Sequence, residues 1–593
     1  MSINNLKIEN VRGLDRLIIS SKILKNRPNI LVAPNGFGKT SIATAFKCAA
    51  DQTSIKLEDE ERHDHDNNKK ATIELELEEN GSLSILSATE QARSNDIRKH
   101  FDIHVVSDLR KLKATTQWLP GGHGKPKAKM VIDPIVICKK VNRANSPYKI
   151  SESRRTFGQH KKVLPNIEVS LFQSHDFVMR SPECWQYIDE LIKTRKWNQI
   201  ENVRNQLSNY SGSTDDGLLH IATAVNDLFD NLQEAKELLS IIEATTKLCG
   251  VEAFLSFWQM LTLARNSRDA LNNHLEWLRY SEIKQSLKDG LNDLNTSWKT
   301  PSLKETKGNL VVVMPDPTHI SNGQRDVLLL LSLLHIARYN LVKSRAILIV
   351  DEVFDYLDDA NLTVAQYYIS QLIEDYKRQG RSIYTIILTH LNPTFFRNYV
   401  FSNQNTIYLE NGTAYDSIDA MKKLIGARSQ DGYDEALKKN ISKYLVHYYS
   451  GDYDFTESLK SISGMRSSWG KRGKFQGFLR DEFVKYSGNQ PYDPLAICAV
   501  TRRSIEELAF GQISEQPDAN DFFNTHKTSP KLDWAVQRGA AIPETHYLLR
   551  VIFDDGLHWN INRDNTIPIV AKLANPIIKK MIIEVVNKCM ESE

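Results

Sequence analysis

The stretch Ala33-Pro34-Asn35-Gly36-Phe37-Gly38-Lys39-Thr40-Ser41 decides the fold of this chain. It follows an apolar run at residues 29–32 and leads into residues 42–46, which have a helix-like composition. A strand, a glycine-containing loop that ends in Lys-Thr, and a helix together predict a phosphate-binding loop, because the backbone N–H groups of the loop and the helix N-terminus both attract phosphate oxygens. The usual first glycine is replaced by Ala33, while Gly36 and Gly38 remain beside the lysine.

The side chains of this loop predict distinct roles in nucleotide binding. Lys39 is expected to reach the β- and γ-phosphates of ATP, and the Thr40 hydroxyl to hold Mg²⁺. The residues expected to contact the nucleotide here are Asn35, Gly36, Gly38, Lys39, Thr40 and Ser41. Glycine-rich loops also form ordinary turns, so the prediction depends on the motifs further along the chain.

The composition favours a cytoplasmic protein of several domains. The chain has 593 residues, of which 41% are hydrophobic and 25% charged, with a net charge of +3. The six cysteines are scattered and include no C-x-x-C pair, which argues against a zinc site and fits a reducing compartment. The N-terminus has no signal pattern, and the most apolar run, at residues 327–336, is roughly half as long as a membrane span.

Two downstream stretches predict the rest of a nucleotide site. Ser321-Asn322-Gly323-Gln324 precedes an apolar helix at residues 326–339, so N–H groups and a hydroxyl are expected to face a phosphate. Residues 346–352 form an apolar run that ends in Asp351 and Glu352, as in a buried parallel strand with acids at its carboxyl end. Asp351 is expected to hold Mg²⁺, mostly through water, and Glu352 to polarise the attacking water.

Two further motifs follow in the same region. Residues 354–358 end in Asp358, and residues 386–390 form an apolar strand that ends in His390. Taken separately, two acids or a histidine at a strand end are often structural. Their order around a phosphate loop makes coincidence a weak explanation.

This order of motifs resembles that of ABC-type ATPases. The N-terminal strand–turn–strand and the long insertion between the phosphate loop and the S-x-G-Q signature resemble the SMC, RecF and OLD branch in particular. The resemblance implies an α/β fold, in which an ABC/SMC-like ATPase head is split by a helical insertion and followed by a mainly helical C-terminal domain. The expected domains are residues 1–180, 181–300, 301–420 and 421–593.

The resemblance also implies a composite site between two head-to-tail subunits. Ser321 and Gly323 of one subunit are expected to cap the γ-phosphate that Lys39 of the other holds. The implied nucleotide-contacting set therefore adds Ser321, Gly323, Gln324 and Asp358; the implied catalytic residues are Glu352 and His390; the implied metal residues are Thr40, Asp351 and Gln173.

A basic stretch at residues 111–162 suggests a second activity. Its lysines and arginines are expected to contact DNA or RNA, although solvated loops have a similar composition. Arg155 and His160 match the R-x₄-H spacing of a HEPN ribonuclease, a short match that chance explains well. In the last third, residues 466–475 interleave basic and aromatic side chains, which predicts stacking on nucleic acid, although a flexible surface loop fits equally well. Residues 554–562 superficially suggest an HNH-like or metal site, but a turn at Asp555-Gly556 explains that pattern more simply.

The architecture as a whole is similar to the PtuA-type ATPases of Septu and retron anti-phage systems. That similarity implies an ATP- and Mg²⁺-dependent homodimer or higher homo-oligomer that controls a separate HNH-type nuclease. One alternative is a self-contained, anticodon-nuclease-like effector with RNase activity in residues 421–593. Another is a RecF/SMC-like DNA-binding repair ATPase.

Overall fold

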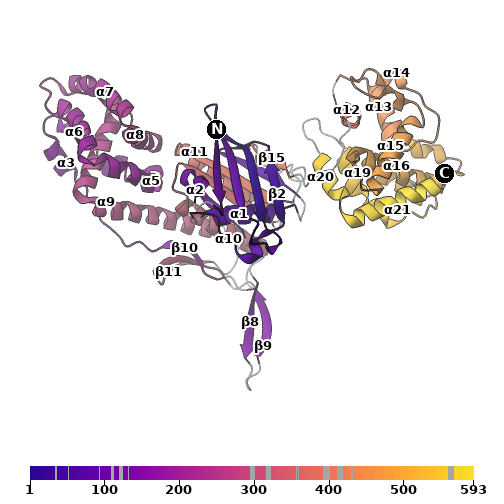
Figure 1. Cartoon of the computed structure of the whole chain (residues 1–593), viewed down its shortest axis with the longest axis horizontal. Helices are drawn as coiled ribbons and strands as arrows, with labels where there is room; N and C mark the ends of the chain where they lie inside the picture. Colours follow the sequence, from indigo (N-terminus) through magenta and orange to yellow (C-terminus); the bar gives the residue numbers. More distant parts are fainter. Residues whose placement is uncertain are drawn as a thin grey trace. The chain divides into compact units, whose positions relative to one another are not determined.

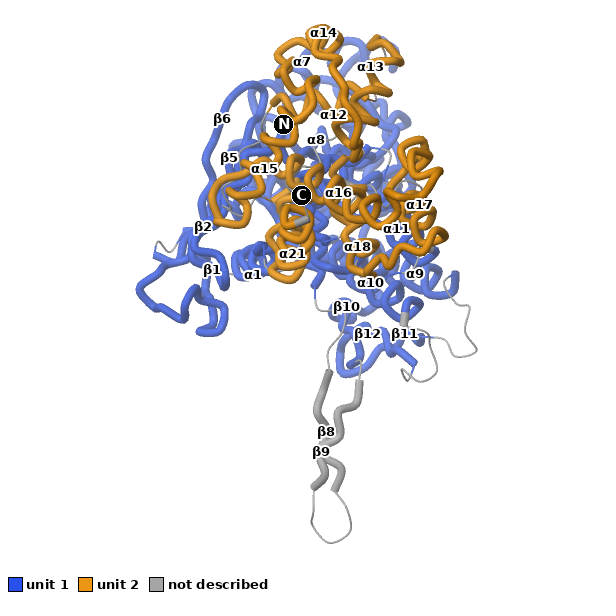
Figure 2. Tube along the Cα trace, turned by 90° about the vertical axis from the view of Figure 1, so that its right-hand side faces the viewer, with its two compact units in different colours: residues 1–407 blue, residues 408–593 orange. Residues whose placement is uncertain are grey.

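The chain folds into two compact units, Met1–Ile407 and Tyr408–Glu593, which are coloured separately in Figure 2. The second unit therefore begins earlier in the chain than the expected boundary at residue 421. The computed structural model describes the chain apart from residues 34–36, 51–52, 92–93, 108–111, 119–123, 131–132, 294–300, 316–321, 355–356, 358, 391–400, 402, 410–418, 429, 431, 558–565 and 593.

A sheet in the order β15-β4-β14-β13-β7 forms the centre of the first unit. Its strands are β4 (Arg27–Val32), β7 (Asp102–Val106), β13 (Arg345–Asp351), β14 (Ser382–Thr389) and β15 (Asn405–Tyr408). The four neighbouring strands β4, β14, β13 and β7 pair in parallel. Residues 346–350 are fully buried, as expected of a parallel strand that is covered on both faces.

Three helices that follow predicted motifs pack against this sheet (Figure 1). They are α1 (Lys39–Ala50), α10 (Asn322–Asn340) and α11 (Asp359–Arg378). Helix α1 contacts β7 and β13, α10 contacts β7, and α11 contacts β14. A short helix, α2 (Asp96–His100), precedes β7.

The N-terminal strands form an antiparallel sheet in the order β2-β1-β5-β6, with β3 paired to β1. The strands are β1 (Ser2–Val11), β2 (Leu14–Ile19), β3 (Ile23–Leu24), β5 (Thr72–Glu79) and β6 (Ser82–Thr89). Asn80 and Gly81, with φ of 49° and 83°, make the tight turn between β5 and β6. Helix α1 also contacts β1.

A helical insertion separates the phosphate loop from α10. It contains α3 (Ile150–Phe157), α4 (Ile167–Ser170), α5 (His175–Leu191), α6 (Thr194–Ser208), α7 (Thr214–Asn231), α8 (Gln233–Thr245) and α9 (Gly250–Asp293). Figure 1 shows α9 running from the other insertion helices to α10, and non-helical φ and ψ at Ser267 mark a kink within it. Helices thus begin at Ile150, ahead of the expected start at residue 181.

Two small strand groups come from the segments just before and just after this insertion in the sequence. β10 (Ile135–Lys139), β12 (Asn309–Val313) and β11 (Ser302–Thr306) form a three-stranded sheet in that order. β8 (Leu112–Trp118) and β9 (Gly124–Met130) form an antiparallel hairpin within the basic stretch.

The second unit is mainly helical, which confirms the predicted fold class of an α/β head with a helical C-terminal region. Its helices are α12 (Asp419–Ala427), α13 (Glu435–Asn440), α14 (Thr456–Leu459), α15 (Lys474–Ser487), α16 (Pro494–Gly511), α17 (Thr528–Val536), α18 (Glu544–Leu548), α19 (Arg550–Leu557), α20 (Thr566–Leu573) and α21 (Pro576–Ser592). Helix α16 contacts α15, α17, α19, α20 and α21. No helix in the described part of the chain is both long and apolar enough to cross a membrane.

Candidate nucleotide site

Three of the predicted motifs meet at the carboxyl ends of the four parallel strands. The pairing register places Val32 beside Thr389, Asp351 beside Leu388, and Val350 beside Val106. The phosphate loop, the acids after β13 and the histidine after β14 therefore leave the sheet at one edge. Ligands of open α/β sheets bind outside this edge, in line with the sequence prediction.

One hydrogen bond ties the phosphate loop to the neighbouring strand, and another joins its two ends. The Ala33 N–H donates to the Thr389 carbonyl oxygen at 3.1 Å, and Lys39 Nζ donates to the Ala33 carbonyl oxygen at 2.8 Å. Lys39 is 3% exposed and begins α1, followed by an exposed Thr40 and a buried Ser41. Asn35 and Gly36 lie outside the described residues.

Gly38 holds a conformation that other residues rarely adopt. Its φ is +86°, and a Cβ added there would lie 2.5 Å from Leu14 Cδ2. Leu14 begins β2, so the turn of the N-terminal hairpin packs on the phosphate loop. Glycine is therefore required at position 38 for both its left-handed backbone and its lack of a side chain.

The two acids at the end of β13 differ in their surroundings. Asp351 is 8% exposed and is the last residue of the strand, whereas Glu352 is half-buried just beyond it. Glu352 has φ of +54°, and its N–H donates to the Leu388 carbonyl oxygen at 3.0 Å. A left-handed backbone at a glutamate costs about 1–2 kcal/mol, and such strain is concentrated at functional sites.

The remaining motif residues are placed less completely. His390 is exposed and directly follows Thr389. Gly323 and Gln324 are half-buried in the first turn of α10, while Ser321 and Asp358 lie outside the described residues.

A buried charge pair, which no sequence motif predicted, lies beside the signature. Arg325 Nε and Nη2 both donate to Asp326 Oδ1 at 3.2 Å, and the two residues are 1% and 0% exposed. The pair lies directly after Gln324, so its two charges are buried behind the first turn of α10, where the signature residues lie.

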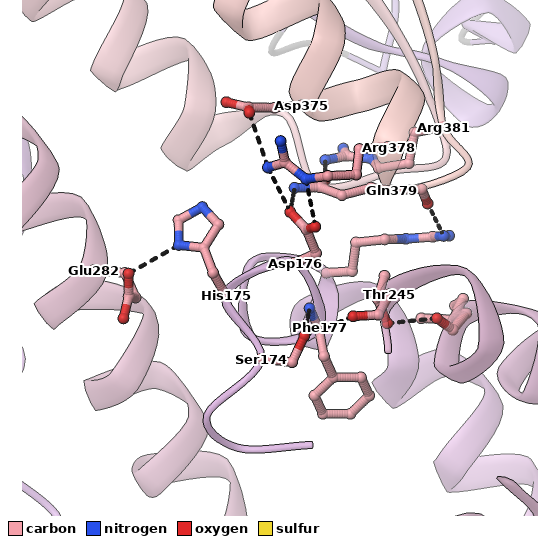
Figure 3. Close-up of polar contacts among 12 residues, drawn as sticks. Ser174, His175, Asp176, Phe177, Thr245, Glu282, Asp375, Arg378, Gln379 and Arg381 are labelled. Atoms are coloured by element: carbon pink, nitrogen blue, oxygen red, sulfur yellow. Dashed lines mark hydrogen bonds and ion pairs between the residues drawn. The ribbon is translucent and has the colours of Figure 1, made fainter. Parts of the chain in front are cut away.

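The structure does not bring Gln173 together with the phosphate loop. Gln173 is exposed and precedes Ser174, which caps α5. Asp176 accepts hydrogen bonds from Arg378 Nε at 2.6 Å and Nη2 at 2.9 Å (Figure 3). Because Arg378 ends α11 shortly before β14 begins at Ser382, this segment lies at the amino end of β14, opposite the nucleotide edge.

Ser107 occupies a place at the edge that the sequence analysis missed. It follows the last residue of β7, and the register of β7 with β13 carries it alongside Asp351. The signal was the short alternation at residues 102–106, which the charged residues around it obscured.

Other sequence candidates take structural positions. Both ring nitrogens of His160 form hydrogen bonds, Nδ1 with Thr214 Oγ1 at 2.9 Å and Nε2 with the Tyr210 carbonyl oxygen at 2.8 Å, so the R-x₄-H match does not present this histidine as a catalytic base. Trp469 and Phe475 are 3% and 0% exposed. The prediction that the basic–aromatic stretch stacks on nucleic acid is therefore wrong for these two rings.

The region at residues 554–562 is only partly described. Residues 558–565, which include most of the HNH-like pattern, lie outside the described residues. In the part of the chain that the structure describes, no group of three or more His, Cys, Asp and Glu side chains is arranged to hold a metal ion.

A buried polar cluster in the second unit was not predicted either. Glu506 Oε1 accepts from Thr528 Oγ1 at 2.8 Å and contacts His447 Nδ1 at 2.7 Å, and Oε2 accepts from Lys531 Nζ at 2.9 Å and the Tyr448 N–H at 3.0 Å. Burial lowers the pKa of His447 to about 4. Burial opposes ionisation of Glu506, but attraction to His447 and Lys531 outweighs it and lowers the pKa of this carboxyl.

Comparison with known proteins gives structural similarity alone. No family model matches the chain, and a search of curated proteins found no match. Among solved structures, an SMC head domain from Pyrococcus furiosus, bound to the C-terminal domain of ScpA, is 12% identical with a TM-score of 0.26, covering 67% of this chain and 92% of that one. The SMC head domain from Thermotoga maritima is 14% identical with a TM-score of 0.20, covering 66% and 90%. An SMC head domain from Pyrococcus yayanosii is 10% identical with a TM-score of 0.23, covering 66% and 92%.

Proposed function

We propose that this chain binds ATP with Mg²⁺ and hydrolyses it. The observation that carries the proposal is the convergence of Lys39, Asp351, Glu352 and His390 at one edge of a parallel sheet, although they come from distant parts of the sequence. The glycine-only position 38 and the helix N-terminus at Lys39 form a cradle suited to phosphate oxygens.

The residues at this edge fit a magnesium–nucleotide complex. Thr40 offers a hydroxyl and Asp351 a carboxylate, and Mg²⁺ prefers oxygen ligands of these kinds, completed by phosphates and water. When bound, the metal neutralises charge on the phosphates. Lys39 adds a further positive charge for the β- and γ-phosphates.

Glu352 is proposed as the catalytic carboxylate. Its left-handed backbone turns the chain directly after β13, and its N–H fixes that turn to β14. In this role it orients and polarises a water molecule whose oxygen attacks the γ-phosphorus, while the bond from phosphorus to the β–γ bridging oxygen breaks. His390, exposed after β14, is proposed to contact the γ-phosphate.

The site is proposed to close only between two copies of the chain. The set that would cap the nucleotide of the other subunit consists of Ser321, Gly323, Gln324 and, after β13, Asp358. The first turn of α10 supports this role, because Gly323 and Gln324 lie in it and the N–H groups of a helix N-terminus attract phosphate oxygens. ATP then acts as the link between subunits, and hydrolysis releases them.

The Glu352→Gln variant tests catalysis and dimerisation together. We expect ATP affinity to change little, turnover to fall about 100-fold or more, and the dimer to persist with ATP in light scattering. Glu60→Gln, the same change at an exposed glutamate, serves as the control and should behave as the unchanged protein. Undiminished ATP turnover by Glu352→Gln would rule out the assigned role.

For the biological role we propose the ATPase subunit of an anti-phage defence complex, in which the ATP-dependent dimer senses a trigger and controls an associated HNH-type nuclease. What supports it is the architecture, an ATPase head with a short helical insertion followed by a separate helical unit. Fold alone does not fix function, so the test is biochemical. The purified protein should hydrolyse ATP without cutting nucleic acid, and cleavage should require the product of a neighbouring gene. Cleavage of tRNA by the chain alone would favour an anticodon-nuclease-like effector instead.

A further inference from the structure

A cavity of about 680 Å³ lies in the first unit, away from the nucleotide edge. The segment after β10, helices α5 and α9, and the end of α10 enclose it. Tyr339 lines it at the C-terminal end of α10, whereas Gly323 lies at the other end, about 24 Å away along the helix. A cavity of this size accommodates a small molecule or one end of a chain.

Positive charge dominates the lining of the cavity. It contains four cationic side chains, Lys139, Lys140, Arg143 and Arg279, and one carboxylate, Glu276. Lys140 is engaged with Glu305 at 2.7 Å. Within the described residues, Lys139 and Arg143 form no ion pair, so no carboxylate neutralises either charge. The guanidinium of Arg143 lies 5.7 Å from the centre of the Trp277 ring.

Arg279 is the buried member of this set. It is 7% exposed and donates through Nη2 to the carbonyl oxygens of Arg338 and Tyr339, at the end of α10. Its Nε has no hydrogen-bond partner among the described residues. Burial lowers the pKa of this guanidinium, as expected where no carboxylate compensates a buried charge. A buried, partly unsatisfied guanidinium in a basic cavity calls for an anion.

The other lining residues suit a planar, hydrogen-bonding group. Trp185 and Tyr339 contribute aromatic rings, and Asn272 and Asn273 contribute side-chain amides. The guanidinium of Arg268 lies 4.9 Å from the centre of the Trp185 ring, and that of Arg279 lies 4.6 Å from the centre of the Tyr339 ring, so a base would use the remaining surface of each ring. Aromatic rings stack on nucleobases, and amides hydrogen-bond to their edges. Cations, rings and amides in one cavity match the parts of a nucleotide: phosphate, base face and base edge.

We propose that this cavity binds a phosphorylated nucleotide, supplied either as a free mononucleotide or as the end of a nucleic-acid strand. The phosphate is held by Lys139, Arg143 and Arg279, and the base lies against the aromatic lining. Lys139, Lys140 and Arg143 belong to the basic stretch 111–162, so this part of the stretch forms a defined binding site.

The first experiment measures binding of two probes to the full-length chain. The probes are AMP and a 5′-phosphorylated oligothymidylate of about twelve nucleotides. Lys39→Ala is present throughout, so that the phosphate loop contributes little. We expect Lys139→Glu with Arg143→Glu to weaken binding of at least one probe by about tenfold or more. The matched control, Arg155→Glu with Lys162→Glu, reverses the charge of two exposed cations of the same stretch that lie outside the cavity.

The outcomes separate the sources of the ligand. Binding of AMP that the cavity variant loses identifies a free nucleotide, and binding of the oligonucleotide alone identifies a strand end. Equal loss in the cavity and control variants would overturn the proposal, as would failure of the parent protein to bind either probe.

A second measurement uses salt dependence. Each phosphate contact that is removed lowers the slope of log affinity against log salt by about one. For the oligonucleotide, Lys139→Ala with Arg143→Ala should therefore reduce the slope, while Arg155→Ala with Lys162→Ala should not. ATP turnover in the background that retains Lys39 should be unchanged by the cavity variant, so failure of the proposed ATPase would not be mistaken for failure of this site. An unchanged slope in the cavity variant would contradict direct phosphate contact.

Discussion

The two units each contain a glutamate in an unusual environment, and the two environments differ in kind. Glu352 lies half-buried at the end of β13, where the chain turns away from the sheet with φ of +54°. Glu506 lies in the middle of α16 with 0% exposure and four hydrogen-bonding neighbours. One carboxylate lies at the edge where we propose that ATP binds, and the other is enclosed by the protein.

This difference separates residues that act on a ligand from residues that hold a fold. A buried carboxylate that is fully hydrogen-bonded has no capacity left for a substrate, so Glu506 stabilises contacts among α16, α17 and the segment at residues 447–448. A strand-end carboxylate is less enclosed, and its strained backbone indicates a role other than stability. The comparison predicts that changes at Glu506 alter unfolding, whereas changes at the nucleotide edge alter turnover.

Glu506→Ala should give the largest effect. Removing this carboxylate leaves Lys531 buried at 2% exposure without its partner, which costs about 3–5 kcal/mol in unfolding free energy. Chemical denaturation of the full chain measures the loss. Glu515→Ala, at an exposed position of the same unit, should change the unfolding free energy by less than about 0.5 kcal/mol. Equal effects of the two substitutions would show that the cluster around Glu506 does not stabilise the second unit.

Lys39→Ala should act on the ligand instead. Loss of the ammonium group is expected to weaken ATP binding by about 100- to 1,000-fold, since it removes a charge placed for the phosphates. Isothermal titration with a non-hydrolysable ATP analogue measures the affinity. Lys47→Ala, an exposed lysine on the same helix, is the control and should bind normally. Normal affinity in Lys39→Ala would refute the phosphate-loop assignment.

The sequence predicted buried parallel strands with polar residues at their carboxyl ends because these signals are local. Each motif is a short apolar run followed by one or two polar residues, and parallel strands carry such residues to the same edge. Residues 29–41, 346–352 and 386–390 each contain their own evidence. Gln173 had no such strand before it, and its neighbour Asp176 lies at the opposite end of β14.

The buried cluster around Glu506 could not be predicted, because its signals are not local. Its partners lie as far as 59 residues away in the sequence, and no spacing rule relates a histidine before one helix to a lysine in another. Ser107 was not predicted because β7 is short and only some of its side chains are buried. Such positions follow from tertiary packing, which a local pattern does not contain.

Lowering the pH should destabilise the cluster around Glu506. Burial lowers the pKa of His447 to about 4, below its value of about 6.5 in an unfolded chain. Between these pH values the unfolded state binds a proton that the folded state does not, so stability falls as pH is lowered, by up to about 3 kcal/mol from this group. The lowered pKa of Glu506 acts in the same direction, since its contribution is complete above about pH 5 and is lost at lower pH.

Denaturation curves between pH 7 and pH 4 measure this effect. His447→Gln keeps an amide that can donate to Glu506 but does not titrate, so the variant should lose less stability over that range than the unchanged protein. His220→Gln, at an exposed position outside the cluster, provides the matched comparison and should keep the original pH dependence. Parallel curves for the His447 variant and the unchanged protein would show that this histidine does not contribute.

Asp176 and Arg378 should give the smallest effect, because their contact is intermediate between the two glutamates. The carboxylate of Asp176 holds α5 of the insertion to the end of α11 through both Nε and Nη2 of Arg378 (Figure 3). Arg378 is 54% exposed and also contacts Asp375 at 2.9 Å, so it keeps a partner when Asp176 is removed. A double-mutant cycle with alanine at both positions should therefore yield a coupling of only about 0.5–1 kcal/mol in unfolding free energy, with ATP turnover unchanged. A coupling of several kcal/mol would show that this contact stabilises the fold as strongly as a buried ion pair. A change in turnover without a change in stability would show that it acts on the proposed nucleotide site at the other end of β14.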